Sequence, residues 1–180
     1  MEDSLKEYKE KRNPKKTPEP MGGKSSRKPI FVVQKHDASH LHYDFRLEIG
    51  NVLKSWAVPK GPSLNPKDRR LAVMTEDHPL DYANFEGVIT EGYGAGTVMI
   101  WDKGSVVAEE PMEEGLKKGK LSFKLNGKKL KGGWSLIQMR GGRNWLLAKR
   151  GDEYASNRDI LAEEPNSAVS GKSMEKIASG

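Results

Sequence analysis

The sequence contains no cysteine, and this absence removes several kinds of chemistry. Disulfides, zinc–thiolate sites and cysteine nucleophiles are excluded, so a metal ion must be held by histidine, carboxylate and water. No apolar run approaches about eighteen residues, and the N-terminus lacks a hydrophobic leader segment. These absences favour a soluble cytoplasmic protein with no membrane partner.

Hydrophobic residues are also scarce, at 35% of the chain, and the mean hydropathy is −0.75. A chain of 180 residues is still long enough for one domain with its own core. Together these values predict a compact core with polar ends, and we expect a monomer. We expect a basic N-terminal arm at residues 1–29, a core domain at 30–150 and a mobile C-terminal tail at 151–180.

The net charge of +6 and the pI of about 9.4 favour a polyanionic partner. Most of the net charge falls in the arm, which has nine basic and five acidic residues. Its first part, from about Ser4 to Arg12, has the spacing of a short helix that docks through Leu5 and Tyr8. The prolines and glycines that follow favour an extended segment.

Short alternating segments separated by turn residues dominate residues 30–150 and predict a mainly β protein. Gly50-Asn51, Asn126-Gly127 and Gly141-Gly142 have the composition of hairpin turns. Helix is expected at Met112 to Lys118 and as a turn between Asn157 and Glu163. The fold class that follows is an antiparallel, closed or nearly closed β-barrel with one or two short helices.

The most unusual segment is residues 34–48, which contains three of the four histidines. From Leu41 the pattern alternates, so His42, Asp44 and Arg46 share one strand face at intervals of roughly 6.5 to 7 Å. Imidazole and carboxylate are ligands for transition metals, and a nearby arginine suits an anionic oxygen. His36 could complete the set if the chain bends near Ala38.

Three further features lie outside that strand. His78 precedes a proline, which excludes a helical conformation at the histidine. Lys60 lies on a stiffened Pro-Lys-Gly-Pro loop that suits a phosphate contact. The glycines at 92, 94 and 96 favour a bend between strands over a phosphate cradle, because no Gly-Lys-Ser/Thr motif or helix follows.

Several ordered motifs together resemble the 3'-phosphoesterase domain of bacterial DNA ligase D over about residues 5–150. They are the segments 36–48 (HDASHLHYDFRLE), 56–62 (WAVPKGP), 76–82 (EDHPLDY) and 91–96 (EGYGAG). The ligase and polymerase modules of the multidomain enzyme are absent. The resemblance therefore implies a free-standing phosphoesterase, with a separate DNA ligase as a candidate partner.

The resemblance implies a manganese-dependent enzyme, with other divalent transition metals as alternatives. It would act on the DNA 3' end of a primer-template, removing a 3'-terminal ribonucleoside and then the remaining 3'-phosphate to leave a 3'-OH. Carried over by motif, the metal ligands are His36, His42 and Asp44. Arg46, His78 and Tyr82 would face the scissile phosphate. The residues expected to bind substrate or complete the site are Arg12, Glu19, Gln34, Lys60, Arg70 and Glu76.

Two positions depart from the family pattern. Asn13 follows Arg12 where the family usually has aspartate, a departure expected to weaken ribonucleoside removal. Thr90 replaces a proline that commonly precedes Glu91-Gly92, which affects loop rigidity more than chemistry.

Two other functions remain open from the residues themselves. His42-x-Asp44 with a distal histidine also matches the facial triad of non-haem iron oxygenases, although the surrounding arginines and lysines favour phosphate. A non-catalytic nucleic-acid-binding barrel would need only the basic surface. Such a module usually exposes aromatic residues along a groove, whereas Tyr43, Phe45 and Trp56 fall at core positions.

Overall fold

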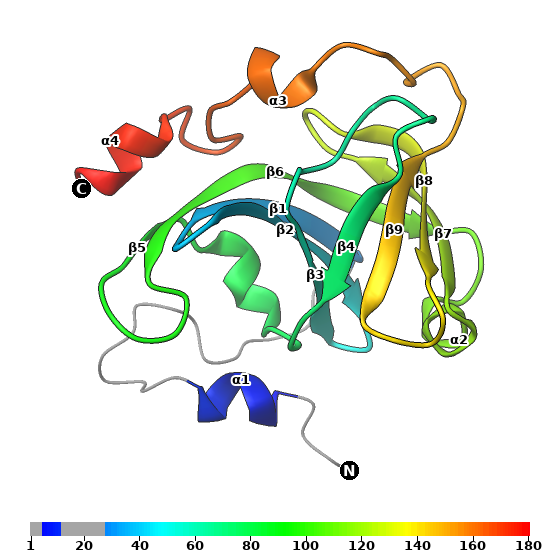
Figure 1. Cartoon of the computed structure of the whole chain (residues 1–180), viewed down its shortest axis with the longest axis horizontal. Helices are drawn as coiled ribbons and strands as arrows, with labels where there is room; N and C mark the ends of the chain where they lie inside the picture. The colour runs from blue at the N-terminus through cyan, green and yellow to red at the C-terminus, as the bar shows by residue number, and fades with distance from the viewer. Residues whose placement is uncertain (1–4, 12–27) are drawn as a thin grey trace.

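The computed structural model describes residues 5–11 and 28–180, and most of the chain is β-sheet (Figure 1). The strands are β1 Ile30–Asp37, β2 Leu41–Ile49, β3 Val52–Val58, β4 Arg70–Met74, β5 Gly87–Ile89, β6 Gly96–Ala108, β7 Lys120–Asn126, β8 Lys131–Gln138 and β9 Asn144–Lys149. The helices are α1 Lys6–Glu10, α2 Met112–Lys118, α3 Ile160–Glu163 and α4 Met174–Ala178, with a 3-10 helix, η1, at Leu80–Asn84. The described residues thus hold more short helices than the one or two expected.

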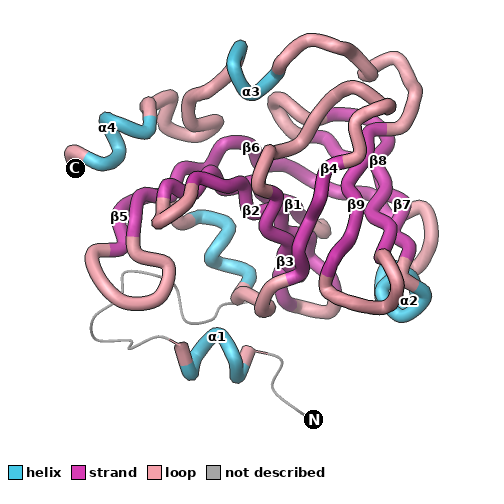
Figure 2. Tube along the Cα trace, in the orientation of Figure 1, coloured by secondary structure: helices cyan, strands magenta, loops and turns pink. Residues whose placement is uncertain are grey.

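The sheet closes into a barrel, which confirms the predicted fold class. All strand pairs are antiparallel, in the order β1-β2-β3-β4-β9-β8-β7-β6-β5, and β6 also pairs with β1. This pairing joins eight strands into a ring and leaves β5 as an extra strand beside one end of β6. Figure 2 shows the helical segments around the outside of the strands.

The barrel interior holds most of the aromatic side chains that the chain possesses. Trp56, Trp101, Trp134 and Trp145 are all fully buried in one cluster that also contains the inward-facing residues of β2. A chain with only 7% aromatic residues therefore concentrates them where each buries the most apolar area. The expected core positions of Tyr43, Phe45 and Trp56 are confirmed.

A second cluster covers the outer face of the barrel beside the histidine-rich strand. It consists of Tyr8, Val32, Leu53, Leu80, Tyr82, Ala83 and Ile100. Tyr8 belongs to α1 and Leu80, Tyr82 and Ala83 to η1, so both helices pack on this face (Figure 1). Asp44 and Arg46 on the polar face of β2 are consequently buried, although its alternating pattern resembles that of a solvent-facing strand.

Hairpin turns fix the strand register. Gly50 and Asn51 both have positive φ angles, of 62° and 68°, and join β2 to β3 as a two-residue turn, as predicted. The β7–β8 turn differs from the expected two-residue Asn126-Gly127 turn, because Asn126 pairs with Lys131 across a four-residue loop.

The carboxylate of Asp102 on β6 explains the longer β7–β8 loop. It is fully buried and accepts the backbone N–H groups of Lys128, Lys129 and Leu130, at 2.9, 3.2 and 2.8 Å. A Cβ atom at Gly127 would lie 2.4 Å from the same carboxylate, so only glycine fits there. The loop is therefore organised by a residue more than twenty positions earlier in the chain.

Residues 151–180, expected as a mobile tail, pack on the barrel instead. Ile160 and Ile177 are buried in the inner cluster, and the Trp101 indole N–H donates to the Glu164 carbonyl at 2.8 Å. The segment is poor in large apolar residues, and these two isoleucines provide much of its apolar contact with the barrel.

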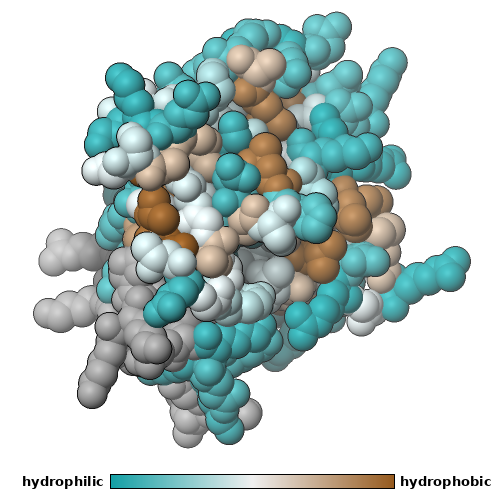
Figure 3. Space-filling view, turned by 60° about the vertical axis from the view of Figure 1, so that its left-hand side comes forward, coloured by the Kyte–Doolittle hydropathy of each residue, from teal (hydrophilic) through white to brown (hydrophobic). Residues whose placement is uncertain are grey.

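The face drawn in Figure 3 is largely hydrophilic, with hydrophobic residues in small separate groups. None of the helices in the described ranges has the length and apolar composition needed to span a bilayer.

Candidate metal and phosphate site

The pairing of β1 with β2 places the candidate ligands on adjacent strands. His36 lies opposite His42 and Gln34 opposite Asp44 in the register, and their side chains extend from the outer face of the barrel. The sequence could not fix the direction of His36, and this register decides it. The structure therefore brings the predicted set of His36, His42 and Asp44 together.

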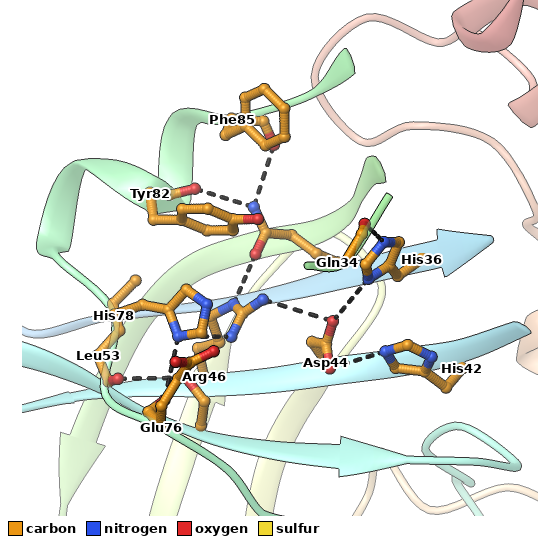
Figure 4. Close-up of polar contacts among 12 residues, drawn as sticks. Gln34, His36, His42, Asp44, Arg46, Leu53, Glu76, His78, Tyr82 and Phe85 are labelled. Atoms are coloured by element: carbon orange, nitrogen blue, oxygen red, sulfur yellow. Dashed lines mark hydrogen bonds and ion pairs between the residues drawn. The ribbon is translucent and has the colours of Figure 1, made fainter. Parts of the chain in front are cut away.

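The three side chains converge on one point (Figure 4). His36 Nδ1 lies 3.5 Å from Asp44 Oδ2, and His42 Nε2 lies 3.2 Å from Asp44 Oδ1. One ligand atom from each residue lies within 4.8 Å of the others. Among the described residues this is the group of histidine and carboxylate side chains that could hold a metal ion.

Backbone carbonyls orient both imidazoles toward that point. His36 Nε2 lies 2.7 Å from the Gly94 carbonyl, and His42 Nδ1 lies 3.0 Å from the His40 carbonyl. A carbonyl can only accept, so each of these ring nitrogens carries the proton in the neutral ring. The other nitrogen then presents its lone pair beside Asp44, an arrangement typical of histidine ligands. Two imidazoles and a carboxylate fit a divalent transition metal.

Arg46 is the charged neighbour of this group and is 3% exposed. Its Nε donates to Gln34 Oε1 at 2.6 Å, and a terminal nitrogen lies 3.4 Å from Asp44 Oδ2. Gln34, also fully buried, donates from Nε2 to the carbonyls of Tyr82 and Phe85 at 2.9 and 3.0 Å. Gln34 therefore connects the guanidinium to η1 and fixes its orientation.

His78 lies on the other side of Arg46. Its backbone forms an isolated bridge with Leu53 through two hydrogen bonds of 2.8 and 2.9 Å, which confirms the extended conformation expected before proline. Nδ1 lies 3.2 Å from an Arg46 terminal nitrogen and 3.1 Å from the Glu76 carbonyl. The guanidinium is a donor and the carbonyl an acceptor, so these two contacts favour opposite tautomers of the imidazole.

Aromatic rings pack against His78 and Arg46. The Tyr82 ring centroid is 4.7 Å from that of His78, and the Arg46 guanidinium carbon lies 4.9 Å from the Tyr82 centroid. Tyr8 from α1 contacts His78 edge-on at 4.9 Å. Tyr8 is fully buried. The i, i+3 spacing of Leu5 and Tyr8 predicted that Tyr8 would dock on the body of the protein, but it did not identify His78 as the contact.

The charge balance favours an ionised Asp44. Burial alone would raise the pKa of this carboxyl, but the Arg46 guanidinium and the two imidazoles hold it well below its ordinary value. Burial also acts to lower the pKa of His42, yet its contact with Asp44 raises it above the usual range. The carboxylate is thus available as a ligand beside the Arg46 guanidinium.

These groups line a cavity of about 500 Å³. The other lining residues include the Thr75–Glu76 segment and the glycine loop, which is Gly92, Tyr93, Gly94 and Ala95. The glycine loop is the expected bend between strands, and it also supplies the Gly94 carbonyl that orients His36. The sequence did not predict this second role. The three closely spaced glycines were the one feature that could have indicated it.

Not every predicted substrate residue reaches the cavity. Gln34 and Glu76 are buried at the site, whereas Lys60 and Arg70 line a separate concavity of about 460 Å³ with Lys67 and Arg69. Arg70 is also 3.8 Å from Asp68. Arg12 and Glu19 lie outside the described residues.

A known protein family matches the part of the chain that contains these site residues. Residues 34–138 match the family model described as the DNA Ligase D 3'-phosphoesterase domain. The Multifunctional non-homologous end joining protein LigD of Pseudomonas aeruginosa is 51% identical over 181 residues, covering 94% of this chain. The corresponding DNA repair protein of Mycobacterium tuberculosis is 44% identical and the Mycolicibacterium smegmatis protein 42%, each over 89% of the chain. The chain spans only 22% of the length of each of these relatives.

Proposed function

The chain belongs to the DNA ligase D 3'-phosphoesterase domain family, and on that premise we propose that it is a metal-dependent enzyme that repairs DNA 3' ends. The single observation that carries the proposal is the convergence of His36, His42 and Asp44 beside the buried Arg46. The proposed substrates are primer-templates ending in a ribonucleoside or in a 3'-phosphate.

Two hydrolyses would produce a ligatable end. In the first, water attacks phosphorus, the bond to the 5' oxygen of the terminal ribonucleoside breaks, and that oxygen takes up a proton. The primer then ends in a 3'-phosphate. The second hydrolysis releases inorganic phosphate and leaves a 3'-OH, which is the end that a DNA ligase partner requires.

The protein groups at the site have separable roles in these steps. Arg46, fixed by Gln34, would bind two phosphoryl oxygens and balance the charge that develops on them. His78, which lines the cavity, would donate a ring N–H to a phosphoryl or departing oxygen. The burial of both residues excludes water and strengthens these contacts.

His36, His42 and Asp44 would hold the ion, for which we propose Mn²⁺, with other divalent transition metals as alternatives. Such an ion supplies Lewis-acid polarisation of the phosphate and of the attacking water. Its removal should abolish both activities.

The test uses a 5'-labelled primer-template with one 3'-terminal ribonucleotide, incubated with Mn²⁺ or EDTA. We expect stepwise conversion to a 3'-phosphate and then a 3'-OH, lost with EDTA and with His42→Ala. His40→Ala is the matched control, because His40 is exposed and only its backbone carbonyl contacts His42. Titration of Mn²⁺ followed by electron paramagnetic resonance should show binding to the control and not to His42→Ala.

Other outcomes separate the alternatives. Conversion of a 3'-phosphate alone would support the phosphatase activity but not ribonucleoside removal. The Asn13→Asp variant would then test whether the asparagine at this position is responsible for the missing step. Activity under anaerobic conditions would exclude an oxygenase reaction. Unchanged DNA ends with the DNA still bound would refute the enzymatic proposal and leave a binding module.

A further inference from the structure

An exposed tyrosine stands at the mouth of the cavity, and none of the steps above uses it. Tyr93 is 51% exposed and belongs to the glycine loop that lines the cavity. Gly92 and Gly94 on either side have φ angles of 89° and 80°, conformations that suit glycine and that hold the loop in a sharp bend. A large exposed aromatic side chain beside a phosphate site is a stacking surface for a nucleobase.

Lys11 links this ring to Glu76, another residue that lines the cavity. Its Nζ lies 4.4 Å from the Tyr93 ring centroid and 3.6 Å from Glu76 Oε2, although Lys11 and Tyr93 are more than eighty residues apart. Burial acts to lower the pKa of Lys11, but Glu76 and Tyr93 raise it above the ordinary value, so the ammonium stays charged at neutral pH. The cation–π contact orients the ring, and the two side chains form a bridge across the cavity mouth.

We propose that Tyr93 and Lys11 form a subsite for the terminal nucleoside that the enzyme removes, with the base on the tyrosine ring. The proposal rests on the proposed function and names the group that it recognises. A bridge anchored on both walls encloses a strand end more easily than a continuing strand, which needs a path out on both sides. The nucleoside beyond the scissile phosphate is that strand end.

The test asks whether the enzyme senses the base of the leaving nucleoside. Two primer-templates are compared, one ending in a ribonucleoside and one ending in an abasic ribose with hydrogen at C1'. The readout is the ratio of their kcat/KM values for removal of the terminal group. Stacking on an aromatic side chain is worth about tenfold or more in such a ratio.

We expect Tyr93→Ala to bring this ratio close to one and Tyr93→Phe to retain it. Tyr154→Ala is the matched control, because Tyr154 is 45% exposed and does not line the cavity. Lys11→Met should lower the ratio partway, and it should have no further effect on base dependence when Tyr93 is already alanine.

The outcomes are distinguishable. A wild-type enzyme that removes neither terminal group refutes the ribonucleoside-removing step of the proposed function and the subsite with it. A wild-type enzyme that removes both, with a ratio that Tyr93→Ala leaves unchanged, refutes the subsite alone. Equal losses on both substrates would assign Tyr93 to loop structure and would also overturn the proposal.

Discussion

Replacing Gln34 with leucine tests whether one buried amide holds the buried Arg46 in place. Leucine has a similar size but removes both the acceptor for Arg46 and the donor for the carbonyls of Tyr82 and Phe85. The neighbouring groups are buried or partly buried, so water cannot readily replace the amide. The variant should lose stability and misplace the guanidinium.

The magnitude follows from the three hydrogen bonds. The bond from the charged Arg46 contributes about 1.5–3 kcal/mol, and the two neutral bonds about 1 kcal/mol each. Their loss predicts a decrease of about 3.5–5 kcal/mol in the free energy of unfolding. For a protein of this size, such a change lowers Tm by about 10 °C.

The assay is denaturant unfolding together with 3'-end processing. Gln138→Leu is the matched control, since the Gln138 side chain makes an exposed bond to the Gly142 carbonyl, and it should cost under about 1 kcal/mol. Gln34→Glu retains an acceptor for Arg46 but not the two donated bonds, so its stability should lie between leucine and wild type. A Gln34→Leu protein as stable as the control, or one with full activity, would refute this account of Arg46.

Two other predictions concern the scaffold. Gly96→Ala should lower the free energy of unfolding by more than about 3 kcal/mol, because its Cβ would lie 2.2 Å from the Asp37 carbonyl at a φ of 142°. Gly142→Ala, with open space around it, should be nearly neutral. Similar losses in the two variants, measured by denaturant unfolding, would contradict the close approach of Gly96 to β1. Burial acts to raise the pKa of Asp152, but hydrogen bonds and the buried Lys149 ammonium lower it from 3.8 to about 2. The resulting stability is present above about pH 4 and is lost as the pH falls through 2. Wild type should therefore lose more stability than Asp152→Asn over that interval. Equal losses in the two proteins would argue against the ion pair.

Part of the candidate site was predictable from sequence because strand geometry is local. Side chains two residues apart share a face of a strand, so His42, Asp44 and Arg46 had to lie together once the Leu41–Ile49 pattern identified a strand. The proline after His78 likewise restricted the backbone conformation locally. The resemblance to the phosphoesterase family then supplied roles that periodicity alone left open.

Other features depended on pairing between distant segments. Register placed His36 opposite His42, and Gly94 reached His36 only through the β5–β6 loop. The same pairing kept Lys60 and Arg70 out of the cavity, although the resemblance had grouped them with it. No local pattern carries this information, because it depends on which strands become neighbours when the barrel closes.

The sequence by itself determined the β class and the polar strand face that carries His42, Asp44 and Arg46, since period-two alternation and turn composition act within a few residues. Only the tertiary structure decided that this face is buried and that α1 covers it through Tyr8. It likewise placed Asp102 beneath the β7–β8 loop. The physical reason is that burial and hydrogen-bond partners are set by long-range closure of the barrel, whereas the face of a strand is set by the covalent geometry of the chain.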